Sequence, residues 1–249
     1  MCGFTGYLTS GYIDQSNSPK IIREMTNSLY HRGPDSEGFW SDSSDGISLG
    51  FRRLAILDTS SNGNQPMQSS NGQYVLVFNG EIYNHLDLRK EIEAFYSGKK
   101  VWFSGSDTET ILSGFEIWGI RETIKKCIGM FGFAVWCKKT KVLTLGRDRL
   151  GEKPLYWGRI RLKGYDQSAI AFTSDLSALW SIPEIQKEIN NLTAMKMNSQ
   201  QQVDGFEASV KTLQTIKRLC KTMSRRKAYL EEFCRMKCDS SVKFETSPH

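Results

Sequence analysis

The stretch YVLVFNGEIYN, residues 74–84, joins an apolar run to an Asn-Gly pair. Residues 74–78 are aromatic, β-branched or aliphatic, which favours a β-strand. A strand that ends in Asn79-Gly80 can present a side-chain amide beside a sterically open backbone N–H, and two such donors can stabilise a tetrahedral oxyanion. Asn-Gly also favours a type I′ hairpin turn, and on the local pattern alone the turn is the preferred interpretation.

Further segments on both sides of this stretch have strand or helix patterns. Strands are predicted at 3–9, 49–57, 130–137, 142–145, 154–157 and 169–173, and helices at 21–30, at 85–95 and after Ser106-Asp107, where a side chain can cap the first turn. The strands outnumber the helices, and the helices fall in groups instead of alternating with strands. The sequence therefore predicts a layered α+β fold and not a doubly wound parallel sheet.

Length and charge divide the chain into two parts. Its 249 residues are enough to bury a sizeable core, and its net charge is +6. Residues 1–186 carry 21 Lys and Arg against 20 Asp and Glu, whereas residues 187–249 carry 12 against 7. We therefore expect a body over residues 2–186 and a basic tail over 187–249, partly helical near 213–223 or disordered. The tail has no interleaved aromatic residues, so nucleic-acid binding is not expected.

Composition also bears on the compartment. No apolar run approaches the ~18 residues that span a bilayer, and the first residues lack the basic flank and long apolar core of a secretory signal. The six cysteines are irregularly spaced, which predicts reduced thiols, a cytoplasmic location and no membrane association. Cys234 and Cys238 match zinc-ligand spacing poorly, so no metal site is expected.

Cys2 is a candidate nucleophile because removal of Met1 would place a thiol and a free α-amine on one residue. A free α-amine titrates near pH 8 and can take the thiol proton close to neutrality. Such a nucleophile carries its own base and needs no histidine partner. The position alone is a weak signal, since a cysteine after Met is often only a small residue near a terminus.

Two charged positions could recognise a free α-amino acid. Arg52 and Arg53 are adjacent in a predicted strand, so only one of them can face a site shared with Cys2. A guanidinium holds a carboxylate through two parallel hydrogen bonds. Asp107 could accept from an ammonium group, although a simple helix cap is the common role for such a residue. The residues alone leave the choice between Arg52 and Arg53 open, and they do not show that either lies near Asp107.

Eight motifs occur in a characteristic order: MCGF at 1–4, HRGPD at 31–35, RLAILD at 53–58, QPM at 65–67, FNGEIYN at 78–84, GSDTE at 105–109, GMFGFA at 129–134 and GRDRLGEKPLY at 146–156. In this set the sequence resembles the glutaminase domain of the class II glutamine amidotransferases, and most closely the asparagine synthetase branch. The resemblance extends over residues 2–186.

This resemblance implies an N-terminal-nucleophile hydrolase fold, a four-layer αββα sandwich with two antiparallel sheets. It implies that Cys2 attacks the side-chain amide of L-glutamine, that a thioester releases ammonia, and that water then frees glutamate. By motif position it assigns the oxyanion hole to Asn79 and Gly80. It assigns glutamine binding to Arg53, Leu54, Ala55, Ile56, Leu57, Asn79, Gly80, Glu81 and Asp107.

Other conspicuous residues are interpreted as structural. His31, Arg32 and Asp35 are expected in a loop that closes over the site, with their polar groups holding the loop's own backbone. Arg147-Asp148 and Glu152-Lys153 are expected to form structural salt bridges or a partner-facing loop. Cys127 and Cys137 are predicted to be core thiols.

The sequence departs from the asparagine synthetases after residue 186. Neither a Ser-Gly-Gly-x-Asp-Ser pyrophosphate loop nor a Walker-type phosphate loop occurs, so no cofactor is expected in this chain, and ATP and magnesium would belong to an absent synthetase domain. We expect this chain to supply ammonia for asparagine biosynthesis, with a separate synthetase chain or a second copy of itself as partner. The alternatives are amidation of a sugar or cell-surface polymer, and a truncated inactive product.

Overall fold

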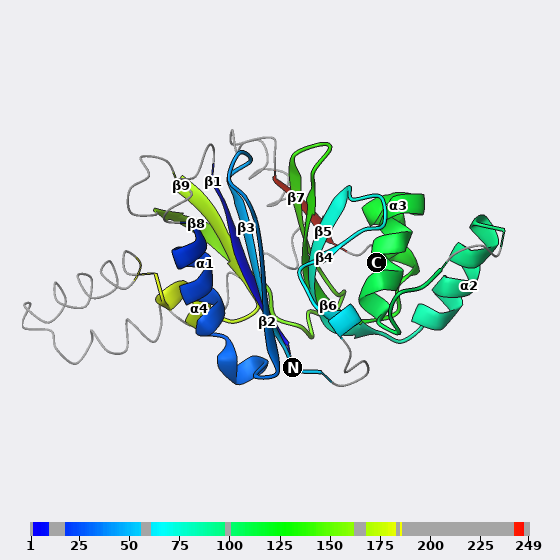
Figure 1. Cartoon of the computed structure of the whole chain (residues 1–249), viewed down its shortest axis with the longest axis horizontal. Coiled ribbons are helices and arrows are strands. Elements are labelled where there is room, and N and C mark those ends of the chain that lie inside the picture. Colours follow the sequence, from blue (N-terminus) through cyan, green and yellow to red (C-terminus); the bar gives the residue numbers. More distant parts are fainter. Residues whose placement is uncertain are drawn as a thin grey trace, which may run out of the picture.

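The computed structural model describes residues 2–9, 18–55, 61–97, 101–161, 168–182, 185 and 242–246, which form two β-sheets flanked by helices (Figure 1). The elements are β1 (Gly3–Thr9), α1 (Ser18–Asn27), η1 (Tyr30–Arg32), β2 (Ser36–Asp42), β3 (Ile47–Arg53), η2 (Ser61–Gly63), β4 (Met67–Gln68), β5 (Tyr74–Ile82), α2 (His85–Phe95), α3 (Asp107–Lys126), β6 (Gly129–Cys137), β7 (Val142–Arg147), β8 (Tyr156–Arg161), β9 (Ser168–Thr173), α4 (Ser177–Trp180) and β10 (Val242–Thr246).

Each sheet has five strands. The first has the order β2-β3-β1-β9-β8, with β1 in the centre, and all its pairings are antiparallel. The second has the order β10-β7-β6-β5-β4, with antiparallel pairing from β4 to β7. At its edge β10 pairs in parallel with β7, which adds one parallel strand to an otherwise antiparallel sheet.

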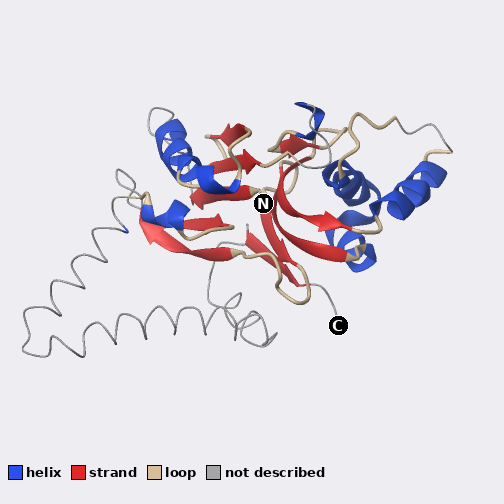
Figure 2. Ribbon diagram, turned by 90° about the horizontal axis from the view of Figure 1, so that it is seen from below, coloured by secondary structure: helices blue, strands red, loops and turns tan. Residues whose placement is uncertain are grey.

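The two sheets face each other, and helices cover their outer faces (Figures 1 and 2). Helices α1 and α4 lie on the first sheet, α3 lies on the second, and α2 packs against α3. Three apolar clusters fill the interfaces between these layers. One lies between α1, α4 and the first sheet, one between the sheets, and one between α3 and the second sheet. The predicted αββα sandwich with two antiparallel sheets is confirmed.

Alternation along β5 shows how one strand serves two of these clusters. Val75 and Val77 belong to the cluster between the sheets, whereas Leu76 and Phe78 belong to the cluster under α3. Successive side chains of a strand point to opposite faces, so a fully apolar run can be buried on both sides. Residues 74–78 are therefore all apolar because β5 belongs to a sheet that is covered on both faces.

The predicted elements agree with the structure in kind and differ mainly at their ends. The helix expected at 85–95 is α2, and the helix expected after Ser106 is α3, where the Ser106 side chain accepts a hydrogen bond from the Thr108 N–H at 3.0 Å. The strand expected at 49–57 is β3, which begins earlier and ends at Arg53. The helix expected in 213–223 lies outside the described residues.

Within the described part of the chain, none of the helices combines the length and the apolar character that crossing a membrane would require.

Candidate active site

The Asn-Gly pair does not end a strand, because β5 continues through Asn79 and Gly80 to Ile82. Asn79 pairs with Gly132 of β6, and Gly80 pairs with Phe131. The expectations of a strand end and of a type I′ turn were both wrong. The pairing with β6, some 50 residues away in sequence, prevails over the local turn preference of Asn-Gly.

The side chain of Asn79 faces the space between the two sheets, on the same face as Val77. The residue is 3% exposed, and among the described residues no partner hydrogen-bonds to its Nδ2. An unpaired buried donor costs free energy, so it signals a group that a ligand can satisfy. Asn79 thus has a free donor ready at the end of the inter-sheet layer.

The N–H of Gly80 points to the edge of β5 that β4 leaves uncovered. At this edge the N–H of Phe78 donates to Gln65 Oε1 at 2.6 Å, and the N–H of Ile82 donates to Asp107 Oδ2 at 2.9 Å. Backbone N–H groups two residues apart in a strand point the same way, so the N–H of Gly80 lies between these two bonds. A Cβ at Gly80 would collide with the backbone of β6, which explains why this position requires glycine.

Cys2 directly precedes β1, the central strand of its sheet, and packs against the inter-sheet cluster. The N–H of Leu54 donates to Cys2 Sγ at 3.3 Å, and Sγ lies 3.5 Å from the carbonyl oxygen of Leu54. The carbonyl of Cys2 accepts a hydrogen bond from Arg32 Nε at 3.1 Å. The sulfur is therefore held at the wall formed by the end of β3.

The two adjacent arginines of β3 have different surroundings. Arg53 is buried, lines the pocket described below, and donates to Asn64 Oδ1 at 2.8 Å. Arg52 instead forms an ion pair with Glu37 at 2.7 Å and donates to Asn27 Oδ1. Because adjacent side chains of the strand point to opposite faces, Arg53 points toward the pocket and Arg52 points away from it.

Asp107 lies at the start of α3 and is 9% exposed. Burial raises the pKa of its carboxyl above the ordinary value, and the nearby Glu81 carboxylate raises it further, whereas the Ile82 N–H bond and His85 lower it. A helix N-terminus favours an anion, which helps this buried carboxylate to stay ionised. Asp107 is therefore a negative group whose charge a cationic ligand would compensate.

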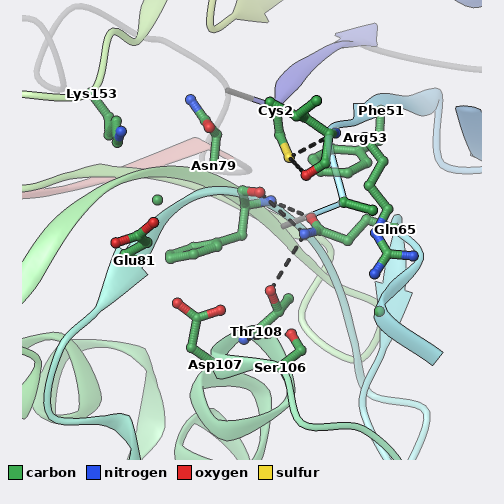
Figure 3. Close-up of a pocket in the computed structure, with 15 residues that line it drawn as sticks. Cys2, Phe51, Arg53, Gln65, Asn79, Glu81, Ser106, Asp107, Thr108 and Lys153 are labelled. Atoms are coloured by element: carbon green, nitrogen blue, oxygen red, sulfur yellow. Dashed lines mark hydrogen bonds between the residues drawn. The ribbon is translucent and has the colours of Figure 1, made fainter. Parts of the chain in front are cut away.

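These residues line one cavity of about 120 Å³. Figure 3 shows Cys2 and Asn79 on one side of it, the Glu81 and Asp107 carboxylates on another, and Arg53 across from the two carboxylates. The predicted residues that line the cavity are Cys2, Arg53, Leu54, Ala55, Asn79, Gly80, Glu81 and Asp107. The predicted residues Ile56 and Leu57 lie outside the described residues.

The polar side chains of η1 and of the loop after it bind neighbouring segments and not the loop's own backbone, contrary to expectation. Asp35 accepts from the N–H of Ala55 at 2.8 Å, which fixes the wall after β3. Arg32 binds the carbonyl of Cys2 and forms an ion pair with Asp175 at 3.3 Å, and His31 also contacts Asp175. The loop thus connects the nucleophile strand to the pocket wall.

Lys153 and Gln65 are among the pocket residues that received no functional role from the sequence. Lys153, interpreted as part of a salt bridge or partner-facing loop, is buried and lines the cavity near Asn79 (Figure 3). Gln65 occurs in one of the ordered motifs, but nothing in the local pattern shows what its amide contacts. The only indication in the sequence that these two residues matter for function was that both lie inside the ordered motifs.

The chain is similar to known amidotransferase sequences. Residues 1–231 match the protein family described as "Glutamine amidotransferase domain". Asparagine synthetase 1 (glutamine-hydrolyzing) of Bacillus subtilis strain 168 is 40% identical over 167 residues, which are 66% of this chain and 25% of that protein. Asparagine synthetase B (glutamine-hydrolyzing) of Escherichia coli K12 is 36% identical over 170 residues, 68% of this chain and 28% of that protein. The chain thus spans about a quarter of the length of these relatives.

A solved structure has a similar fold. The glutamine phosphoribosylpyrophosphate amidotransferase of B. subtilis, complexed with ADP and GMP, superposes with a TM-score of 0.58. The superposition covers 73% of this chain and 43% of that one, at 18% sequence identity. At this identity the likeness concerns the fold.

Proposed function

The chain belongs to the glutamine amidotransferase family, in the class with the N-terminal-nucleophile fold, and from this membership we propose that it hydrolyses the side-chain amide of L-glutamine to glutamate and ammonia. The observation that carries the proposal is that Cys2 and Asn79, whose Nδ2 has no partner among the described residues, line one pocket together with Arg53 and Asp107. These groups match a nucleophile, an oxyanion donor, a carboxylate ligand and an ammonium ligand.

Glutamine would bind through its α-amino acid end. The Arg53 guanidinium pairs with the α-carboxylate, and the carboxylates of Asp107 and Glu81 accept from the α-ammonium. The backbone of Leu54 and Ala55 forms the remaining wall. This binding mode leaves the side-chain amide of glutamine to reach toward Cys2 and Asn79.

The reaction then proceeds in two steps. With Met1 removed, the α-amine of Cys2 takes the thiol proton, and the sulfur adds to the amide carbon. The negative oxygen that forms is held by the Asn79 Nδ2–H and the Gly80 N–H, each of which can be worth about 10²–10³ in rate. The α-ammonium of Cys2 gives its proton to the leaving nitrogen, the C–N bond breaks, and ammonia leaves a thioester. Water adds to the thioester, the C–S bond breaks, and glutamate is released.

The product ammonia points to a place in a larger reaction. The names of both asparagine synthetases above include glutamine hydrolysis, and each match covers about two thirds of this chain. We therefore propose that this chain is the ammonia-supplying half of an asparagine synthetase-like amidotransferase. ATP-dependent amidation of aspartate would be the task of a synthetase module. With ¹⁵N-amide glutamine, aspartate and ATP, this chain alone should release labelled ammonia and form no labelled asparagine.

The direct test measures glutamate release by protein from which Met1 has been removed, as verified by mass spectrometry. Cys2→Ala should abolish the activity, because it removes the nucleophile. The matched control Cys137→Ala changes a buried core cysteine outside the pocket and should keep it. A variant with an added N-terminal segment should be inactive, because its Cys2 nitrogen is an amide and not a base.

Two results would contradict the proposal. Glutamate release by Cys2→Ala would remove the thiol from the mechanism. Full activity of the extended variant would rule out the α-amine as the base. Alkylation of Cys2 by 6-diazo-5-oxo-L-norleucine, a glutamine-shaped electrophile, supplies an independent readout of the same site.

A further inference from the structure

The side chain of Gln65 completes the edge of β5 where β4 stops. Strand β4 pairs Met67 with Leu76 and Gln68 with Val75, and an extension of this register would bring residue 65 opposite Phe78. There the Gln65 side chain takes the place of a backbone partner. Its Oε1 accepts from the Phe78 N–H at 2.6 Å, and its Nε2 donates to the Phe78 carbonyl at 3.2 Å.

The same amide also reaches the first turn of α3. Nε2 lies 3.4 Å from Thr108 Oγ1, and Gln65 and Thr108 are both buried (Figure 3). A primary amide has two N–H donors and a backbone peptide has one, so only a side chain can bind the strand and cross-link it to the helix. Gln65 is thus a bridge between β5 and α3.

Each end of this bridge adjoins a residue of the proposed reaction. Phe78 directly precedes Asn79, and Thr108 directly follows Asp107. Further along the same strand edge, Asp107 accepts from the Ile82 N–H at 2.9 Å. The Gln65 amide and the Asp107 carboxylate therefore flank the N–H of Gly80 on either side, and together they fix the strand edge against the helix end.

We propose that Gln65 is a positioning residue that sets the distance between the oxyanion donors of β5 and the ammonium acceptor on α3. This inference rests on the proposed function, since it concerns the two ends of a bound glutamine. A fixed spacing suits the five-carbon chain of glutamine and disfavours asparagine, which is one methylene shorter. A misplacement of about 1 Å between reacting groups can cost about 100-fold in rate.

The test compares two electrophiles on the same thiol. Iodoacetamide needs only an accessible Cys2, whereas 6-diazo-5-oxo-L-norleucine must also bind through its α-amino acid end. Gln65→Met, which keeps the length of the side chain and removes its hydrogen bonds, should slow alkylation by the glutamine-shaped reagent about 100-fold and leave the rate with iodoacetamide unchanged. The kcat/KM for glutamine should fall in parallel, and the preference for glutamine over asparagine should narrow.

The matched control is Gln68→Met, the same substitution three residues away on β4. Gln68 is exposed and accepts from Lys138 Nζ, outside the pocket, so its ratio of the two alkylation rates should equal that of the wild type. Equal slowing of both reagents in Gln65→Met would indicate a general loss of structure and overturn the positioning role. Wild-type alkylation rates with both reagents in Gln65→Met would overturn the positioning role as well.

A second variant keeps the test decisive if Gln65→Met does not melt cooperatively. Thr108→Val removes only the helix end of the bridge and leaves both bonds to Phe78, so it should lower the same ratio in part. A wild-type ratio in Thr108→Val would overturn the inference. Failure of the wild-type chain itself to react with the glutamine-shaped reagent at Cys2 would refute the proposed function, which separates the two failures.

Discussion

At the scale of single residues, Asp107 shows how a binding site can oppose stability. The folded protein raises the pKa of this carboxyl, mainly by burial, so folding disfavours its ionised form. The penalty is fully present at pH values above the raised pKa and disappears as the pH falls below it. Above that raised pKa the free protein carries the full penalty, which a bound ammonium group would offset.

Asp107→Asn should accordingly separate binding from stability. The loss of a charged hydrogen-bond acceptor should raise the KM for glutamine about 10- to 100-fold, because such bonds contribute ~1.5–3 kcal/mol. The amide oxygen can still accept from the Ile82 N–H, so the thermal midpoint at pH 7 should stay equal or rise. Any gain should shrink as the pH falls through the raised pKa of Asp107, because the protonated carboxyl no longer carries the burial penalty. Glutamate release and calorimetry across this pH range measure both effects.

Asp148→Asn is the matched contrast, since Asp148 is also buried but accepts three backbone N–H groups with its two oxygens, from Phe131, Glu152 and Lys153. One amide oxygen cannot replace both carboxylate oxygens, so this variant should melt at a lower temperature. A similar loss of stability in Asp107→Asn would contradict the expected separation of binding from stability.

At the scale of elements, α3 combines two helical segments that meet at Gly119. This residue has φ 77° and ψ 165°, a backbone conformation that is essentially restricted to glycine. The segment before Gly119 begins at Asp107 and carries the site, while the segment after it leads to β6. Both segments contribute to the apolar cluster under α3, with Phe115 before the kink and Ile124 after it.

Gly119→Ala should lower the free energy of unfolding by about 1–3 kcal/mol, because an L side chain is strained in this conformation. In the described part of the chain, no heavy atom beyond the neighbouring residues and the helix's own backbone lies within 4 Å of the Cβ that the substitution adds, so the loss would come from backbone strain and not from a steric clash. Gly158→Ala, equally open and without a positive φ, should change stability little. Urea denaturation of both variants checks the difference, and equal stability would exclude the backbone explanation.

At the scale of the whole molecule, the two sheets have different tasks. The first contributes Arg53 from β3 and Cys2 directly before β1, and the second contributes Asn79 and Glu81 from β5. The apolar cluster between the sheets therefore sets the distance from nucleophile to oxyanion donor. The cluster under α3 lies on the other face of the second sheet.

Two matched substitutions should reveal this difference. Phe4 belongs to the cluster between the sheets and Phe115 to the cluster under α3, and both are at most 1% exposed. Phe4→Leu and Phe115→Leu should each lower the free energy of unfolding by about 1–3 kcal/mol. Phe4→Leu should slow the reaction of Cys2 with the glutamine-shaped reagent, relative to iodoacetamide, more than Phe115→Leu does. Equal ratios in the two variants would contradict a special role of the inter-sheet cluster.

The sequence by itself determined the layered α+β class, the helices at residues 85–95 and after Ser106, and the family. Apolar periodicity, helix caps and motif order are local or one-dimensional signals, so they can be read without coordinates. The same signals were misleading at Asn79-Gly80, where the local preference indicated a turn and the pairing with β6 made a strand.

Only the tertiary structure decided which groups meet. The Gln65 amide contacts Phe78 and Thr108, which are 13 and 43 residues away in sequence, and the N–H of Leu54 reaches Cys2 from 52 residues away. No local pattern encodes such contacts, because sheet register and the packing of α3 on β5 set them. The sequence therefore determines which functional groups the protein has. The distances between these groups, which would make glutamine a substrate, are set only when the two sheets pack against each other.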